Sequence, residues 1–300
     1  MTASRAVTSL AVATRAHAKL NLTLQVLARE ESGFHQIETL FCAIELADDL
    51  EVSVRGDCVT LDVRSGAGAS VDLGQTQLNL AYRAAMAFRA AAGRSAGAHI
   101  RLVKHIPAGA GLGGGSSDAA AVLRALNALH DGPLSEAALL DVGARLGSDV
   151  PFFLNGAPLA LAWGRGSRLL PLPPLPRAEV LLAVVSEGVR TADAYGALAH
   201  RREQGEAPGV APAVLALPRS WQDVAAAAVN DFEDIVFQRL PQLATLRHAL
   251  ADHGATLARM TGTGSVVFGI FEDAAVMQRA AVAVHEAVPG AGVLLTRTRT

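Results

Sequence analysis

Alternating polar and apolar residues near the start of the chain predict a β-strand. From position 18 to position 26 every even residue is apolar and every odd residue is polar. Because successive side chains of a strand point to opposite faces, the polar residues share one face: Lys19, Asn21, Thr23 and Gln25. A face of this kind is ordinarily solvated, so the pattern alone assigns no chemistry to the lysine.

Further apolar runs in the first half predict an antiparallel group of strands and then helices. Small polar residues over 65–74 predict a loop. Gly93 is expected to end the first helix, and Ser135 is expected to cap the start of the third. The predicted strands cover 36–46, 50–55, 58–63 and 98–104, and the predicted helices cover 79–92, 119–129 and 135–146.

Asp149 stands between the third predicted helix and a short apolar run at 150–154, which we interpret as a strand. An aspartate in such a place is either a turn residue or an active-site acid, and the turn is the commoner case. The residues alone leave both interpretations open.

The second half of the chain alternates between strands and helices. Gly164 to Arg177 is rich in glycine and proline and predicts a domain boundary, whereas the charged stretch 200–209 predicts an exposed loop. Pro241 fits the first position of a helix that Gly254 ends. The order is that of a split βαβ, or ferredoxin-like, sandwich. Its predicted strands are 178–185, 255–260, 266–271 and 293–298, and its predicted helices are 224–240, 241–253 and 273–288.

A glycine-rich stretch joins the predicted strand at 98–104 to the helix at 119–129. It holds five glycines within seven residues, 109–115, followed by Ser116 and Ser117. Glycine lets the backbone approach an anion closely, and the free N–H groups at a helix N-terminus point toward it. The two serines stand where helix caps stand, and their hydroxyls can also face a phosphate or its metal ion. The sequence therefore predicts a phosphate site here.

Sequence context argues against several familiar glycine-rich motifs. Gly109 to Gly114 fits the dinucleotide-binding pattern G-x-G-x-x-G, but the acidic residue at the required spacing, Asp131, lies at a helix end rather than a strand end. A Walker loop needs a lysine after the glycines, and a protein kinase needs H-R-D and D-F-G strings, none of which the chain contains. A mobile linker is disfavoured, since linkers seldom separate a strand from a well-formed helix.

Composition narrows the class of protein. With 300 residues, of which 51% are hydrophobic, the chain is long enough for one large or two modest domains. A net charge of −2 gives no sign of a nucleic acid or an anionic membrane as partner, and no apolar run approaches the roughly 18 residues of a membrane span. Cys42 and Cys58 are expected to be buried free thiols, which favours a reducing, cytoplasmic location.

Several strings together resemble the GHMP kinase superfamily, which includes galactokinase, homoserine kinase and mevalonate kinase. Pro107 to Ser117 is similar to its central motif P-x-G-x-G-L-G-S/G-S/G-S-S, Ala18 to Leu22 to its lysine-bearing strand, and Thr261 to Gly264 to its C-terminal glycine motif. The resemblance implies an α+β fold of two domains. An N-terminal ATP-binding α/β domain like ribosomal protein S5 would span 16–170, after an extension at 1–15, and a ferredoxin-like domain would span 171–300.

The same resemblance implies a kinase that uses ATP and Mg²⁺. Lys19 and Asp149 are implied to be the catalytic pair: Asp149 takes or polarises the proton of the acceptor hydroxyl, and Lys19 offsets charge. Mg²⁺ is expected to be held mainly by the ATP phosphates, with Ser117 as the candidate protein contact. The implied ATP site comprises Asn79 on the adenine side, Lys104, Pro107, Ala108, Gly109, Ala110, Gly111, Leu112, Gly113, Gly114, Gly115, Ser116 and Ser117.

Four strings together are similar to one branch of the superfamily, whose acceptor alcohol carries a cytidine diphosphate. They are Ala18 to Leu22, Gly33 to His35 followed by Glu38 to Phe41, Gly111 to Ser117, and Leu146 to Phe153, of which the first and the last are the specific ones. In that branch two aromatic rings enclose the cytosine and a histidine binds its edge. The resemblance thus implies a substrate site of Phe34, where many members have tyrosine, with Tyr195, His35, Asn21 and Asp149.

Two alternatives stay open beside this branch. One is another small-molecule GHMP kinase, such as homoserine kinase; the other is a non-catalytic sensor on the same fold. The presence of both Lys19 and Asp149 counts against the sensor. The expected partners are ATP and the small-molecule acceptor, in a monomer or a homodimer.

Overall fold

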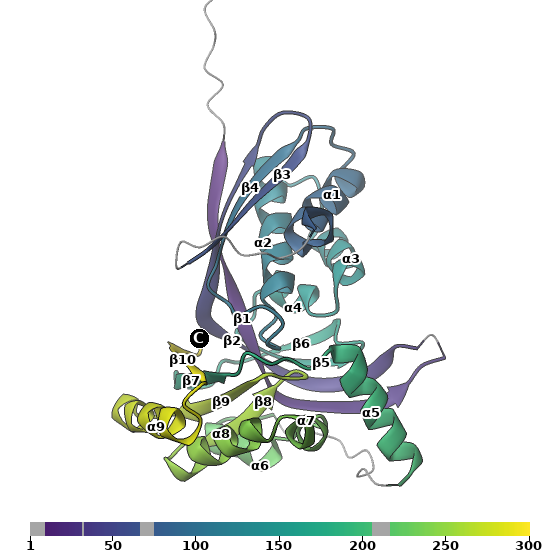
Figure 1. Ribbon diagram of the computed structural model, residues 1–300. Coiled ribbons are helices and arrows are strands. Elements are labelled where there is room, and N and C mark those ends of the chain that lie inside the picture. The colour runs from purple at the N-terminus through teal and green to yellow at the C-terminus, as the bar shows by residue number, and fades with distance from the viewer. Residues whose placement is uncertain (1–9, 32, 67–74, 206–216) are drawn as a thin grey trace, which may run out of the picture. The chain divides into compact units, whose positions relative to one another are not determined.

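The computed structural model describes residues 10–31, 33–66, 75–205 and 217–300. These residues form two compact units that interleave along the chain (Figure 1). The first unit comprises the described residues up to Ala16, together with Ala47–Ile106 and Gly114–Asn155. The second comprises His17–Leu46, Pro107–Gly113 and Gly156–Thr300. The expected division between residues 170 and 171 stays a prediction about domain organisation.

The described part of the first unit combines two whole strands, and parts of two longer strands, with four helices. Strand β4 (Ala98–Lys104) lies between β3 (Val59–Ser65), to which it is parallel, and the C-terminal half of β2 (His35–Val54), to which it is antiparallel. The apolar faces of the helices pack on one another and on the strands, which removes residues such as Phe88 and Ile100 from water. The helices are α1 (Leu80–Ala92), after a 3-10 turn at Thr76–Leu78, α2 (Gly114–Leu129), α3 (Glu136–Leu146) and α4 (Val150–Asn155).

The second unit contains the ferredoxin-like sheet that the sequence predicts. Its strands lie in the order β10-β7-β9-β8, and each neighbouring pair is antiparallel. The strands are β7 (Glu179–Val184), β8 (Leu257–Thr261), β9 (Val266–Phe271) and β10 (Gly292–Arg297). Helices complete the unit: α5 (Thr191–Glu203), α6 (Trp221–Ala227), α7 (Glu233–Arg239), α8 (Pro241–Asp252) and α9 (Ala274–Ala287).

Long strands continue from one unit into the other. Strand β1 (Ala11–Arg29) and strand β2 each contribute residues to both. In the second unit the first half of β2 pairs antiparallel with β5 (Leu159–Gly164), which pairs antiparallel with β6 (Arg168–Leu172). Residues 11–15, expected to belong to an extension, therefore begin a strand; residues 1–9 lie outside the described part.

The helix ends follow their local signals. Ser135 accepts a hydrogen bond from the N–H of Ala138 as the N-cap of α3, and Gly93 ends α1 in the left-handed conformation, with φ of 61°. Pro241 opens α8 as predicted. These signals act on neighbouring backbone groups, so the sequence predicts them well.

The short apolar run at 150–154 was wrongly predicted to be a strand. It forms helix α4, because an apolar run of five residues fits either structure and its context decides. Pro151 is tolerated because it lies in the first helical turn, where the backbone N–H that proline lacks would have no intrahelical partner. Phe152 and Leu154 are then buried.

Other element boundaries also differ from the prediction. The predicted strands 36–46 and 50–55 are one continuous strand, β2. The predicted helix over 224–240 is broken into α6 and α7, since residues 229–231 are extended beside β1. Helix α5 continues to Glu203, into the predicted loop at 200–209, while residues 206–209 and the predicted loop residues 67–74 lie outside the described part.

Burial corrects two further expectations. The polar face of β1 is not solvated: Lys19 is 3% exposed and Asn21 is 4% exposed. Cys42 is buried, and burial raises the pKa of its thiol to about 12, whereas Cys58 is exposed. Over the described ranges, no helix is both long enough and apolar enough to cross a membrane.

Candidate active site

Lys19 is held against the glycine loop in the second unit. Its Nζ donates a 2.8 Å hydrogen bond to the carbonyl oxygen of Gly111 and another to Oδ1 of Asn21. Its backbone N–H donates to the carbonyl of Leu112 at 3.0 Å, and its ammonium lies 5.3 Å from the centre of the Phe41 ring. Both ends of the residue are therefore fixed to the loop, which places a buried cation beside the predicted phosphate site.

Two threonines complete this cluster. The amide Nδ2 of Asn21 donates to Oγ1 of Thr39 at 2.8 Å, and the backbone N–H of Asn21 donates to Oγ1 of Thr261 at 3.0 Å. The Thr261 hydroxyl in turn lies 3.3 Å from the carbonyl oxygen of Gly111. Sequence reasoning assigned neither threonine a role, although Thr261 opens the C-terminal glycine motif.

The glycine loop has a left-handed backbone conformation that residues with a Cβ atom rarely adopt. Gly109, Gly111 and Gly113 have φ of 69°, 75° and 72°. Positive φ at every second residue is a feature of the backbone nests that bind anions. At Gly111 glycine is also required by space, since a Cβ there would lie 2.3 Å from the carbonyl oxygen of Thr261.

The two serines after the loop lie inside a helix, not at its cap. Helix α2 begins at Gly114, so Ser116 and Ser117 occupy its first turn; the glycines themselves extend the helix toward the loop. Ser117 is buried and Ser116 is half-buried. The N-terminal N–H groups of this 16-residue helix still provide the partial positive charge expected for a phosphate site.

Lys104 forms a buried charge cluster in the first unit. Its ammonium pairs with Asp48 and, at 2.8 Å, with Asp118. Asp48 also accepts the backbone N–H groups of His105 at 2.6 Å and Ile106 at 2.8 Å, at the start of the loop. Burial raises the pKa of Asp118 to about 7, against the attraction of Lys104. An ATP contact by Lys104 stays a prediction, and neither aspartate was singled out from the sequence.

Asn79 and Asp149 also lie in the first unit. Asn79 is the N-cap of α1, where its side chain accepts the N–H of Ala81 at 2.9 Å. Asp149 is half-buried in the turn between α3 and α4. Its pairing with Lys19, a residue of the second unit, stays a prediction.

Two of the residues that are predicted to bind cytidine, His35 and Tyr195, contact each other. The rings of His35 and Tyr195 lie against each other with their centres 4.4 Å apart and their planes tilted by 31°, and Tyr195 also contacts Phe232 edge-on. Burial, followed by the charges of Arg29 and Arg202, lowers the pKa of His35, so its imidazole is neutral at pH 7. A neutral ring offers one hydrogen-bond donor and one acceptor, which suits the edge of a nucleobase.

Phe34 presents its ring to solvent. Its side chain is 57% exposed, and the guanidinium of Arg165 lies 4.2 Å from the ring centre. Arg165 is held in turn by Glu30, through hydrogen bonds of 3.1 and 3.3 Å from its Nε and one from its NH2. Arg165 was not recognised from the sequence, in which it is one charged residue of a turn.

The geometry agrees with what comparison with known proteins finds. Residues 79–157 match the model of the GHMP kinases N terminal domain, and residues 211–290 match that of the GHMP kinases C terminal domain. The chain belongs to the GHMP kinase family. As a GHMP kinase it uses ATP, which accords with the glycine loop at the start of α2.

Two relatives and one solved structure that are more than 30% identical to this chain are named as kinases of the same cytidine compound. A 4-diphosphocytidyl-2-C-methyl-D-erythritol kinase of Pelotomaculum thermopropionicum is 42% identical over 258 residues, 86% of this chain and 88% of that protein. One of Deinococcus radiodurans is 39% identical over 288 residues, 95% of this chain and 92% of that protein. A crystal structure of 4-(cytidine 5'-diphospho)-2C-methyl-D-erythritol kinase, 32% identical, has a TM-score of 0.74 and covers 96% of this chain and 100% of its own.

More distant GHMP kinases share the fold alone. A homoserine kinase from Cytophaga hutchinsonii has a TM-score of 0.67 at 15% identity, covering 100% of this chain and 97% of its own. The fold therefore does not choose the acceptor, which must be argued from the site.

Proposed function

We propose that this GHMP kinase transfers the γ-phosphate of ATP to the 2-hydroxyl of 4-diphosphocytidyl-2-C-methyl-D-erythritol. The products are the 2-phosphate and ADP, in the non-mevalonate route to isoprenoid precursors. The observation that carries the proposal is the His35–Tyr195 pair, with Phe34 adjacent in sequence, in a chain whose relatives bear this name. A neutral imidazole beside aromatic surface suits a cytosine better than a small amino acid such as homoserine.

Phosphoryl transfer asks the protein mainly for positioning and for stabilisation of charge. The N–H groups of the glycine loop and the N-terminus of α2 would bind the phosphates of ATP. Lys19, already fixed on Gly111, would offset the charge that develops during transfer. Asp149 would accept or polarise the proton of the acceptor hydroxyl.

In this proposal Mg²⁺ binds together with ATP, through the phosphate oxygens, rather than at a site made only of protein side chains. Within residues 10–31, 33–66, 75–205 and 217–300 no group of three His, Cys, Asp or Glu side chains is placed to hold a metal. Mg²⁺ usually binds through phosphate oxygens and few protein ligands. The Ser117 hydroxyl in the first turn of α2 is the candidate protein contact; when bound, the ion would neutralise phosphate charge.

One assay tests the proposed acceptor. Purified protein is incubated with Mg-ATP and, separately, with the diphosphocytidyl compound, homoserine, mevalonate and galactose, and ADP is followed. ADP formed with the diphosphocytidyl compound, with phosphate on its 2-hydroxyl, is the expected result. ADP formed with another alcohol but not with this one would overturn the proposal.

A further inference from the structure

A short extended segment, residues 229–231, is joined to strand β1. The N–H of Leu24 donates to the carbonyl of Val229 at 2.7 Å, and the N–H of Asp231 donates to the carbonyl of Leu24 at 3.0 Å. The carboxylate of Asp231 accepts the N–H of Val26 at 2.8 Å. The segment is thus fixed to the strand that carries Lys19.

The side chain of Asn230, in the middle of this segment, joins it to a second element. Its Nδ2 donates to the carbonyl oxygens of Met260 at 2.8 Å and Gly262 at 2.9 Å. Its Oδ1 accepts the N–H of Phe232 at 3.0 Å, and the residue is 8% exposed. Both donors and the acceptor of a buried amide are satisfied, so its removal leaves carbonyl groups without partners.

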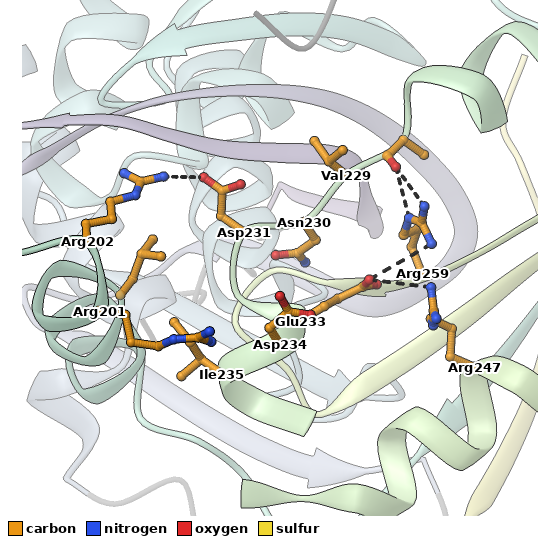
Figure 2. Close-up of a pocket in the computed structure, with 12 residues that line it drawn as sticks. Arg201, Arg202, Val229, Asn230, Asp231, Glu233, Asp234, Ile235, Arg247 and Arg259 are labelled. Atoms are coloured by element: carbon orange, nitrogen blue, oxygen red, sulfur yellow. Dashed lines mark hydrogen bonds and ion pairs between the residues drawn. The ribbon is translucent and has the colours of Figure 1, made fainter. Parts of the chain in front are cut away.

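A buried carboxylate supports the same attachment. Oε1 of Glu233 accepts the N–H of Met260 at 2.8 Å, and burial raises the pKa of Glu233. Figure 2 shows Glu233 between Arg247 and Arg259, whose nitrogens lie 3.9 and 4.0 Å from it, around a cavity of about 220 Å³. Arg259 also donates to the carbonyl of Ala228, just before the segment. The charged side chains of Glu233, Arg247 and Arg259 therefore form contacts within the protein that stabilise this part of the fold.

Thr261 lies between Met260 and Gly262, the two residues to which Asn230 donates, and it contacts the glycine loop. The Thr261 hydroxyl lies between the N–H of Asn21 and the carbonyl oxygen of Gly111. That carbonyl oxygen is the one to which Lys19 donates. A shift of the backbone at 260–262 would therefore move the acceptor that fixes the catalytic lysine.

We propose that Asn230 is a positioning residue for phosphoryl transfer. It holds residues 260–262 at the distance from Gly111 that keeps the Gly111 carbonyl on the ammonium of Lys19. It touches neither ATP nor acceptor and acts only through Thr261. The inference rests on the proposed function in one respect, the use of Lys19 and the glycine loop in transfer; it does not depend on which alcohol accepts the phosphate.

Replacement of the amide tests the proposal against a purely structural role. Asn127 is a matched control: its amide donates to the carbonyl of Leu134 at 3.1 Å and accepts the N–H of Leu134 at 3.0 Å, in the first unit. Both Asn230→Ala and Asn127→Ala should lower the midpoint of thermal unfolding. Only Asn230→Ala should lower kcat, by at least about tenfold, because misplacement of catalytic groups acts on the transition state.

The split between kinetic constants completes the test. In Asn230→Ala the KM for the cytidine acceptor should stay within about twofold, since the residue does not contact that compound. A kcat within about twofold of wild type, at a temperature where the variant is folded, would overturn the proposal. Should Asn230→Ala not fold, Asn230→Ser is measured against the same thresholds. Should the wild-type enzyme phosphorylate another alcohol, the proposed acceptor fails, and the same comparison with that alcohol still decides the role of Asn230.

A double-mutant cycle with Thr261→Val tests whether Asn230 acts through Thr261. If Asn230 acts through Thr261, the loss of kcat in the double variant is smaller than the product of the two single losses, because residues of one network are not additive. Losses that simply multiply would mean independent action and would also overturn the proposal.

Discussion

The ammonium of Lys19 donates a 2.8 Å hydrogen bond to the carbonyl oxygen of Gly111. A buried lysine needs such partners, because an unpaired buried charge is strongly disfavoured. This carbonyl and the amide of Asn21, which the ammonium also meets, are both neutral. These two bonds hold the cation beside the glycine loop, whereas the ammonium of Lys104 is paired with two carboxylates.

Lys19→Met should lower kcat by at least about 100-fold, since it removes the positive charge that we propose to stabilise the transferring phosphoryl group. Arg15→Met is the control, because Arg15 lies on the same strand with its side chain 58% exposed. Steady-state kinetics with Mg-ATP and the cytidine acceptor make the measurement. Equal rates in the two variants would remove Lys19 from the catalytic role.

Gly111→Ala should abolish detectable ATP binding. A Cβ at this position would meet the Thr261 carbonyl at 2.3 Å, so the loop would have to move. Gly109→Ala separates the clash from backbone strain: its φ of 69° is similar, but nothing lies within 4 Å of its Cβ. Titration with ATP should show the larger loss for Gly111→Ala, and equal losses would mean that conformation alone, not the Thr261 contact, demands glycine.

Asp149→Asn should leave the Kd for ATP nearly unchanged and lower kcat by about 100-fold or more, the order of general acid–base effects. The substitution keeps the shape of the side chain and removes the proton acceptor. Asp141→Asn, an exposed aspartate on the preceding helix α3, is the matched control and should turn over normally. Normal turnover by Asp149→Asn would show that Asp149 is only a turn residue.

Local patterns predicted much of the fold. Strand β9 lies at Val266–Phe271 as predicted, and Ser135 and Pro241 begin their helices, because these signals act on neighbouring residues. The break at 229–231 had no such signal. Apolar and alanine-rich residues on both sides favour helix, and pairing with β1, distant in sequence, overrides them.

Some residues of the candidate site could be predicted from local sequence and others could not, again because local patterns report only on neighbouring residues. The glycine loop was recognisable because its chemistry resides in consecutive residues. Lys19 looked like one surface cation, because its burial depends on residues brought from far along the chain, such as Thr261. Only resemblance to a family singled it out. The bonds by which Asn230 attaches residues 260–262 likewise join residues that are distant in sequence, and no local pattern predicts them.

Phe34→Ala should raise the KM for the cytidine acceptor by about tenfold, since loss of stacking on a base amounts to about 1–3 kcal/mol. Its kcat and its KM for ATP should stay close to wild type, because the ring lies away from the reacting groups in the proposed site. Leu170→Ala, which removes another exposed apolar side chain, is the control. An unchanged KM in Phe34→Ala would mean that the base does not stack there.

Asp118→Asn should change how stability depends on pH. The pKa of Asp118 is raised by burial to about 7 in the folded protein, from an ordinary value of 3.8. Between these values the folded state binds more protons than the unfolded state, so this group makes the unfolding free energy fall as pH rises from about 4 to about 7. Asparagine mimics the protonated form at every pH and removes that fall.

The variant should therefore match wild type near pH 4.5 and be the more stable protein near pH 8, measured by urea denaturation at each pH. Subtracting the two curves cancels the carboxylates that lie far from Asp118, because distant sites contribute independently to stability. Lys104→Met is the opposing control: it leaves Asp48 and Asp118 without their cation, so its loss of stability should be greatest at high pH. If Asp118→Asn instead loses more stability at pH 8 than at pH 4.5, the ion pair with Lys104 outweighs the burial of the second carboxylate, and the raised pKa is wrong.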